Sequence, residues 1–234
     1  MCPCRGSWEG IGGQVSELLL VGATGLGREI LASVRSSGRY DVVGFVDGDE
    51  EMVGTEIDGA PVLGTIDDSI HHPHTFFLVC LESGRLRQSV VERLGALGIH
   101  GNRFATVIDS SVRLPGGCRL GRGSVLLQNV LLTASVTLGS HVVAMPGVIF
   151  AHDDAVGDYA TLAAGTAIGG DVRIGRAAYL GMNCSVRGGA SIGQNSTIGM
   201  GAAVLEDVPD GETWAGVPAR PVDHNALEGA AATL

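Results

Sequence analysis

A six-residue repeat in the second half of the chain limits the possible folds more than any other feature of the sequence. From Ile108 to Val208 hydrophobic first positions recur in a single register, and fifteen of the seventeen are Leu, Ile or Val. The fifth position of each hexad is small or β-branched, with one exception. A hexapeptide period is typical of a parallel β-helix, in which three hexads complete one triangular coil. We therefore predict a β-helix over residues 105–222, with no long loop in it.

The irregular positions of the repeat gather around one short segment. Ala144 and Phe150 are the only first positions that are not Leu, Ile or Val, and Asp154 is the only charged residue at a first or fifth position. A local failure in a consistent pattern indicates a functional or strained site. His152 and Asp153 stand at a corner of the prism there. Histidine is a natural general base near neutral pH, and a carboxylate beside it stabilises the imidazolium, so we predict that both are catalytic.

The first part of the chain predicts a Rossmann-like α/β domain over residues 17–104, which would bind a nucleotide or a substrate. LLLVGATGLGREILASVRSSG is typical of a buried strand, a glycine-rich turn and a helix, and DVVGFVD of a second strand. Glycines let the main chain approach a ligand, a helix amino terminus attracts an anion, and a carboxylate after the second strand suits a ribose hydroxyl. The predicted substrate-binding residues are Thr24, Gly25, Leu26, Asp47, Gly48 and Gly64.

Composition indicates the cellular compartment of the protein and excludes some classes of binding partner. A net charge of −10 argues against nucleic acid or an anionic membrane surface as a partner. No apolar run reaches the ~20 residues of a membrane span. Five scattered cysteines and a start without secretory character favour the cytoplasm. We expect residues 1–16 to be a flexible leader and residues 223–234 a flexible tail.

Both halves together resemble the family of sialic-acid O-acetyltransferases and bacillosamine-pathway sugar N-acetyltransferases. The similar segments are GATGLGRE, FVDGDE, GAPVLG, AHDDAVGDY and VPDGETWAGVPARPV, within about residues 17–222. The resemblance implies a left-handed parallel β-helix and transfer of an acetyl group from acetyl-CoA to a sugar or nucleotide-linked sugar, without a metal. It implies that His152 is the general base and that Asp153 raises its basicity. We also predict CoA near Thr161, Met182, Gly199 and Gly201, because the thioester must reach the corner of His152 and the later coils offer a regular groove with glycine turns.

Four positions differ from the usual family pattern. Leu26, Met145, Ala151 and Thr161 replace polar or ionisable residues, which predicts a more apolar acceptor pocket. We also predict a homotrimer, because a prism with outward side chains can bury one side against each neighbour and because the corner of His152 and Asp153 otherwise has no cleft.

Several functions remain compatible with these residues. The first is an N- or O-acyltransferase that forms a ternary complex, acting either on a nucleotide-linked sugar or on a natural-product acceptor without a nucleotide. The second is a non-catalytic trimeric scaffold that binds a nucleotide. A metalloenzyme of the γ-carbonic-anhydrase type requires three histidine ligands, and the predicted stem contains two, His141 and His152. A dehydrogenase requires a second mononucleotide-binding half, which so short a first domain lacks.

Overall fold

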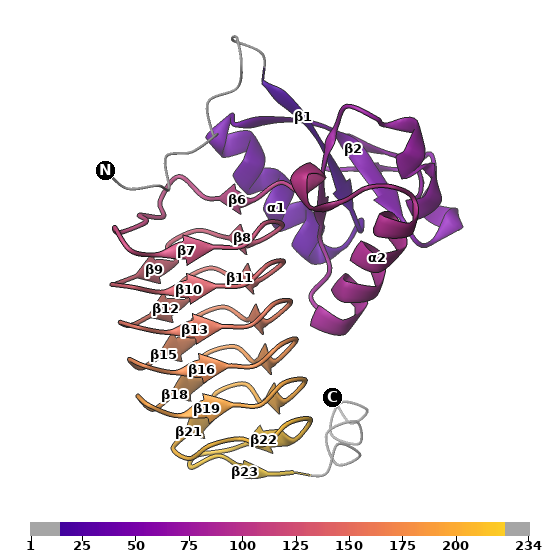
Figure 1. Ribbon diagram of the computed structural model, residues 1–234. Coiled ribbons are helices and arrows are strands. Elements are labelled where there is room, and N and C mark those ends of the chain that lie inside the picture. Colours follow the sequence, from indigo (N-terminus) through magenta and orange to yellow (C-terminus); the bar gives the residue numbers. More distant parts are fainter. Residues whose placement is uncertain (1–14, 223–234) are drawn as a thin grey trace.

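The computed structural model describes residues 15–222 and contains two packed domains (Figure 1). An α/β domain lies beside the first coils of a parallel β-helix, as the sequence predicts. The predicted tail and all but the last two residues of the predicted leader lie outside the described range, and the first strand already begins at Ser16. Within residues 15–222, no helix has the length and apolar character needed to cross a membrane.

The amino-terminal domain is built on a five-stranded sheet with the order β3-β4-β2-β1-β5, in which only the β3–β4 pair is antiparallel. Its strands are β1 (Ser16–Val21), β2 (Tyr40–Asp47), β3 (Glu56–Ile57), β4 (Ala60–Thr65) and β5 (Phe76–Val79). Its helices are α1 (Gly25–Ser37) and α2 (Gly84–Ala96), with the 3-10 turns η2 (Glu50–Met52), η3 (Ile66–His71) and η4 (Gly101–Arg103).

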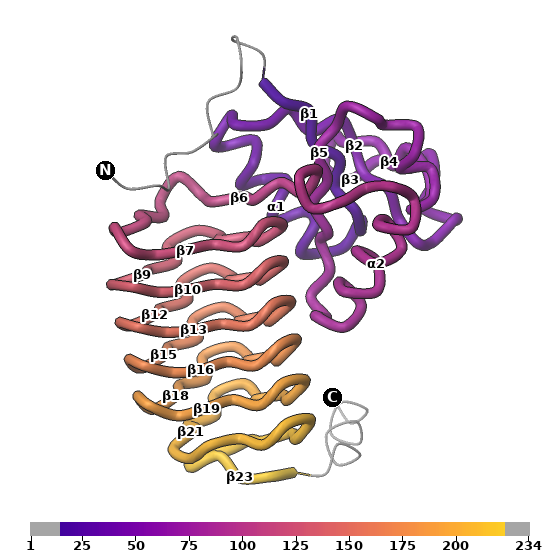
Figure 2. Tube along the Cα trace, in the orientation of Figure 1, coloured from indigo at the N-terminus to yellow at the C-terminus, as the bar shows by residue number. Residues whose placement is uncertain are grey.

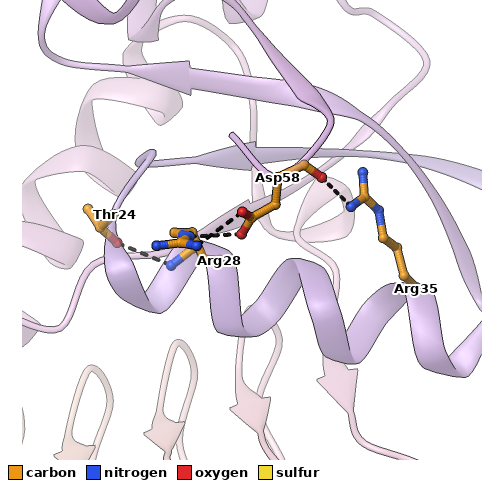
Figure 3. Close-up of polar contacts among 5 residues, drawn as sticks. Thr24, Arg28, Arg35 and Asp58 are labelled. Atoms are coloured by element: carbon orange, nitrogen blue, oxygen red, sulfur yellow. Dashed lines mark hydrogen bonds and ion pairs between the residues drawn. The ribbon is translucent and has the colours of Figure 1, made fainter. Parts of the chain in front are cut away.

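Capping and one ion pair fix the orientation of α1. Thr24 caps the helix, since its hydroxyl accepts a hydrogen bond from the Gly27 amide at 3.2 Å. Arg28 makes a two-pronged contact with the Asp58 carboxylate at 2.8 and 3.0 Å, and Arg35 binds the carbonyl of the same residue (Figure 3). These contacts join α1 to the β3–β4 turn. The glycine-rich turn is therefore held against the carboxyl ends of β1 and β2.

The β-helix has three sheets, one for each side of the prism, and the coils stack directly on one another (Figure 2). The first sheet contains β6 (Val107–Ile108), β8 (Val125–Leu126), β11 (Val143–Ala144), β14 (Thr161–Leu162), β17 (Tyr179–Leu180), β20 (Thr197–Ile198), β22 (Thr213–Ala215) and β23 (Arg220–Pro221). The second contains β7 (Arg119–Leu120), β10 (Thr137–Leu138), β13 (Ala155–Val156), β16 (Arg173–Ile174) and β19 (Ser191–Ile192). The third contains β9 (Leu131–Leu132), β12 (Ile149–Phe150), β15 (Ala167–Ile168), β18 (Ser185–Val186) and β21 (Ala203–Val204).

The inward first positions form one continuous hydrophobic core, which confirms the six-residue pattern. Ala144 and Phe150 are both fully buried in it, at consecutive inward positions of one coil. A small residue followed by a large one keeps the volume of that coil near that of its neighbours. Packing therefore accounts for these two irregular positions.

The prediction of an uninterrupted repeat is wrong at Leu114. No strand forms between β6 and β7, and the Leu114 side chain is 45% exposed instead of pointing inward. Pro115, Gly116 and Gly117 follow it, and such residues favour a turn over a strand. The first coil consequently lacks its third-sheet strand.

Arg87 of α2 joins the two domains. Its side chain is fully buried, and it donates hydrogen bonds to the carbonyls of His141, Tyr159 and Ala160 at 2.8, 2.7 and 3.1 Å. The same guanidinium binds the carbonyls of Leu81 and Glu82 in its own domain. Burial lowers the pKa of Arg87 to about 10, because removal from water disfavours the charged guanidinium. The α/β domain is thus fixed to the corner between the second and first sheets.

Candidate active site

The corner between β12 and β13 presents a histidine and a carboxylate together. His152 Nδ1 lies 2.9 Å from Asp153 Oδ2, and their side chains are 66% and 60% exposed. The backbone turns here because Asp153 adopts a left-handed conformation with φ 63°, as Ser135 and Asp171 do at the same corner in the coils before and after. This corner, residues 151–153, is called the His152 corner below.

Gly170, one coil later, provides the surface on which the imidazole rests. A Cβ atom at Gly170 would lie 2.5 Å from His152 Nε2 and 2.6 Å from Cε1, which is closer than real Cβ contacts allow. Any larger residue at this position would therefore displace the ring. The sequence analysis missed this residue, although its place eighteen residues, or one coil, after His152 was a usable signal.

The hydrogen bond to Asp153 determines which imidazole nitrogen is available. If Nδ1 carries the proton and donates it to the carboxylate, Nε2 keeps its lone pair. This nitrogen can then accept a proton from an acceptor group, and Asp153 can stabilise the imidazolium that forms. The arrangement has the geometry of an oriented general base.

The corner between the first and third sheets contains three of the four predicted CoA contacts. Met182 is 47% exposed there. Gly199 and Gly201 follow in the next coil, and the Gly201 amide donates to the Met182 carbonyl at 2.8 Å. Gly201 has a φ of 66° and no heavy atom within 4 Å of the Cβ position, so the space above it is open. This corner, residues 181–183 and 199–201, is called the Met182 corner below.

The third sheet separates the Met182 corner from the His152 corner. Its outward residues in β9 and β12, Leu131 and Ile149, are 48% and 42% exposed. Ala167, Ser185 and Ala203 continue the same outward row. Apart from Ser185, this outward row is therefore apolar in the single chain, and one candidate corner lies at each edge of the sheet.

Thr161 does not lie where the prediction of a CoA contact requires. Its side chain is completely buried in the joint between the domains. The hydroxyl donates to the Glu82 carbonyl at 2.7 Å and accepts from Arg87 at 3.0 Å. Because the outward side of β14 is covered by the start of α2, this residue serves domain packing instead of a ligand groove.

A hollow of about 320 Å³ lies at the carboxyl ends of β1 and β2. Three predicted substrate-binding residues, Thr24, Asp47 and Gly48, line it. Asp47 already accepts hydrogen bonds from the amides of Ala23 and Asp49 at 2.6 and 2.9 Å, so it orders the glycine-rich turn. Sequence reasoning missed the apolar wall, because its residues come from distant elements. These are Val21, Ile66, Leu81, Leu86 and Val90.

The other three predicted substrate-binding residues do not line this hollow. Leu26 is 1% exposed and packs in the domain core, so its side chain does not make an acceptor pocket more apolar. Gly25 begins α1 beside the hollow without bordering it. Gly64 lies in β4 and packs closely on Asp68, which caps the turn that follows. The prediction of substrate binding is therefore wrong for the Leu26 side chain. Gly64 has a structural role.

His141, the second histidine of the stem, is buried instead of exposed. Its ring stacks on Tyr159 with centroids 5.1 Å apart and meets Phe104 edge-on at 4.8 Å. Burial, with a smaller effect of the Arg87 charge, lowers the pKa of His141 to about 4. Within residues 15–222 no group of three or more His, Cys, Asp or Glu residues could hold a metal ion.

Both halves of the chain are similar to domains of known proteins. Residues 17–94 match the PglD N-terminal domain, and residues 171–205 match the bacterial transferase hexapeptide model. No curated protein sequence matches the chain.

Three similar solved structures cover both domains. PerB from Caulobacter crescentus, in complex with CoA and GDP-perosamine, is 25% identical with a TM-score of 0.81 over 90% of this chain and 99% of its own. The acetyltransferase domain of PglB from Neisseria gonorrhoeae, in complex with acetyl coenzyme A, is 26% identical with a TM-score of 0.80 over 90% and 100%. WeeI from Acinetobacter baumannii is 28% identical with a TM-score of 0.77 over 88% and 100%.

The fold and the His152 corner define a hexapeptide-repeat acyltransferase, in which the repeats form the stem and the α/β domain lies at its side. A PglD N-terminal domain followed by hexapeptide repeats, in a chain similar over both domains to PerB, PglB and WeeI, confirms the resemblance seen in the sequence.

Proposed function

We propose that this protein transfers an acetyl group from acetyl-CoA to an amino or hydroxyl group of a sugar, with His152 as the general base. The observation that carries the proposal is the exposed His152–Asp153 pair, which rests on Gly170 in a fold whose similar structures contain CoA or acetyl coenzyme A. One of these structures also contains GDP-perosamine, which supports a nucleotide-linked sugar as the acceptor here.

The transfer proceeds directly in a ternary complex. The acceptor N–H or O–H bond breaks, its proton moves to His152 Nε2, and the electron pair attacks the thioester carbonyl. Collapse of the tetrahedral intermediate breaks the C–S bond, and the departing CoA sulfur takes the proton from the imidazolium. Main-chain amides of neighbouring coils supply donors for the oxyanion. No covalent enzyme intermediate and no metal takes part.

A homotrimer completes the site in this proposal. The His152 corner and the Met182 corner lie at opposite edges of the third sheet, so CoA along one corner reaches His152 of the same chain only by crossing that sheet. A neighbouring subunit packed on Leu131 and Ile149 would bring its own corner beside the first. Cyclic closure would bury the apolar side of every subunit.

The hollow beside Thr24 and Asp47 is the place for the nucleotide part of the acceptor. Its apolar wall suits the flat faces of a base, and the turn before α1 offers main-chain amides to a phosphate. This arrangement gives the α/β domain a role in substrate capture.

The test is release of free thiol from acetyl-CoA in the presence of a panel of acceptors: GDP- and UDP-linked amino sugars, free amino sugars, and amino alcohols without a nucleotide. We expect thiol release with at least one acceptor, and mass spectrometry should find a product 42 Da heavier, the mass of an added acetyl group. Binding of a nucleotide without thiol release from any acceptor would favour the non-catalytic scaffold.

A further inference from the structure

The carboxyl group of Asp154 is buried inside the β-helix, directly after the two residues of the proposed catalytic pair. The residue is 1% exposed, and its Oδ1 accepts a hydrogen bond from the Val172 amide of the next coil at 3.0 Å. Its Oδ2 is buried and has no partner within residues 15–222. A buried carboxyl oxygen without a partner is costly, so a reason for its presence is required.

Another position of the repeat shows what the fold itself requires. Ser124 also occupies the fifth position of its hexad, and its hydroxyl accepts from the Val142 amide, eighteen residues later, at 3.0 Å. The same hydroxyl donates to the Gly139 carbonyl at 2.9 Å, which leaves no buried atom unpaired. A hydroxyl therefore suffices for the hydrogen bond between coils. What Asp154 adds is a second oxygen and a negative charge.

The pKa of Asp154 depends first on its burial and then on the amides and charged groups around it. Burial raises the pKa of Asp154 to about 6; the Val172 and Ala151 amides and, to a smaller extent, the positive form of His152 lower it, and Asp153 raises it. The preceding coil contributes no ionisable group, since Ser135, Val136 and Thr137 lie there. The following coil places Asp171 and Arg173 on either side of Val172. Within the turn that contains Asp154 itself, His152 is the residue that can carry a positive charge.

We propose that Asp154 is a positioning residue whose buried carboxylate holds the next coil beneath the imidazole and stabilises the positive charge that His152 acquires during acyl transfer. Its hydrogen bond to Val172 fixes the strand that follows Gly170, the residue on which the ring rests. Its charge acts on the imidazolium from inside the β-helix, where solvent screens it less than it screens Asp153. The role in transfer rests on the proposed function; the coupling of charges does not.

The coupling is tested without any substrate, by following the carboxyl carbon of Asp154 by NMR in protein labelled at aspartate, with Asp154→Asn to assign the signal. The midpoint near pH 6 should rise in His152→Ala, because the cation that lowers the pKa of Asp154 is gone. It should fall in Asp153→Asn, because a like charge is removed. An unchanged midpoint in both variants overturns the proposal.

The role in transfer is tested by the isosteric variant Asp154→Asn, which keeps an acceptor for Val172 but loses the charge. We expect kcat to fall roughly tenfold, the KM for acetyl-CoA to stay within about twofold, and the acid limb of the rate profile to move. Asp154→Ser, built on the geometry of Ser124, should behave in the same way. Ser124→Ala is the matched structural control and should lower thermal stability with kcat and the profile unchanged.

The outcomes separate the two proposals. Wild-type kcat and pH profile in Asp154→Asn would overturn the role of Asp154 even in an active enzyme. If wild-type protein acetylates no acceptor while the NMR midpoints shift as expected, the proposed function fails and the coupled pair remains. Circular dichroism of each variant confirms that the β-helix has folded.

Discussion

A methyl group added to Gly170 would lie 2.5 Å from Nε2 of His152, so the imidazole of one coil and the main chain of the next are in direct contact. The stacking of coils thereby sets the height of the ring above the corner. Asp153 controls the rotation of the same ring through Nδ1. Two neighbours thus hold an imidazole that is otherwise largely open to solvent.

The Gly170 contact predicts a strong effect from the smallest possible substitution. Gly170→Ala should displace the imidazole and lower kcat by a factor on the order of 10², the size expected when a catalytic group is misplaced by about 1 Å. Steady-state kinetics measures this, and Gly116→Ala is the control, since nothing lies within 4 Å of a Cβ there. Equal kcat values for the two variants would show that catalysis does not require the contact between the imidazole and Gly170.

Removing the base itself should have the largest effect on chemistry. His152→Ala is expected to lower kcat by roughly 10²–10⁴, the range for loss of a general base, and to leave CoA binding nearly unchanged. Asp153→Asn should lower kcat by a smaller factor, because it keeps a hydrogen-bonding partner for Nδ1. Turnover and calorimetric CoA affinity are measured for both. A His152→Ala enzyme with most of its turnover would place the base elsewhere.

The architecture was predictable because every coil of the β-helix repeats the same pattern of inward hydrophobic positions. Each inward position depends on neighbours six and eighteen residues away, so the period alone identified the core. The His152 corner was located in the same way. The prediction that Leu114 continues the repeat failed because Pro115 and the two following glycines favour a turn. Leu114 also lies at the end of the stack, where no earlier third-sheet strand pairs with it.

Positions that depend on the docking of the domains were not predictable. Arg87 occurs in a polar, amphipathic helix, and nothing local distinguishes it from the exposed arginines nearby. Thr161 follows the outward pattern of the first sheet, and only the packing of α2 buries it. Leu26 lies in the glycine-rich turn but faces the core. Such contacts join residues more than fifty positions apart, beyond the reach of any periodic pattern.

The joint between the domains should be sensitive to Arg87. Arg87→Met removes five carbonyl contacts and the bond to Thr161, so buried acceptors lose their donor. We expect the free energy of unfolding to fall by about 3 kcal/mol or more, measured by urea denaturation. Arg85→Met, which removes an exposed contact to Asn195, is the control and should change stability by less than about 1 kcal/mol.

Acid should destabilise the same joint through His141. Its pKa is lowered from 6.5 to about 4 in the folded protein, so the folded state binds the proton more weakly than the unfolded state. Stability from this group is therefore complete above pH 6.5 and falls as the pH drops towards 4, by about 3 kcal/mol in total.

His141→Phe isolates this effect, because it keeps an aromatic ring beside Tyr159 and cannot titrate. The difference in unfolding free energy between the variant and the wild type should increase as the pH falls from 6.5 to 4. Urea denaturation over that range measures it. The comparison also removes the contribution of Asp154, whose raised pKa acts in the opposite direction in both proteins. A difference independent of pH would contradict the burial of a neutral His141.

The position of CoA is the last prediction. We expect its pantetheine arm along the Met182 corner, because no heavy atom lies within 4 Å of the Cβ position of Gly201 and a ligand can approach the main chain there. Gly201→Trp should fill that space and weaken CoA binding at least tenfold by calorimetry, while nucleotide binding by the α/β domain is retained. Gly98→Trp is the matched control, because Gly98 shares the positive φ and the open surroundings but lies after α2, in the other domain. Both variants place a tryptophan at a positive φ, so a loss of CoA affinity confined to Gly201→Trp would report occupation of the groove. Equal affinities in two folded variants would exclude the Met182 corner as the CoA site.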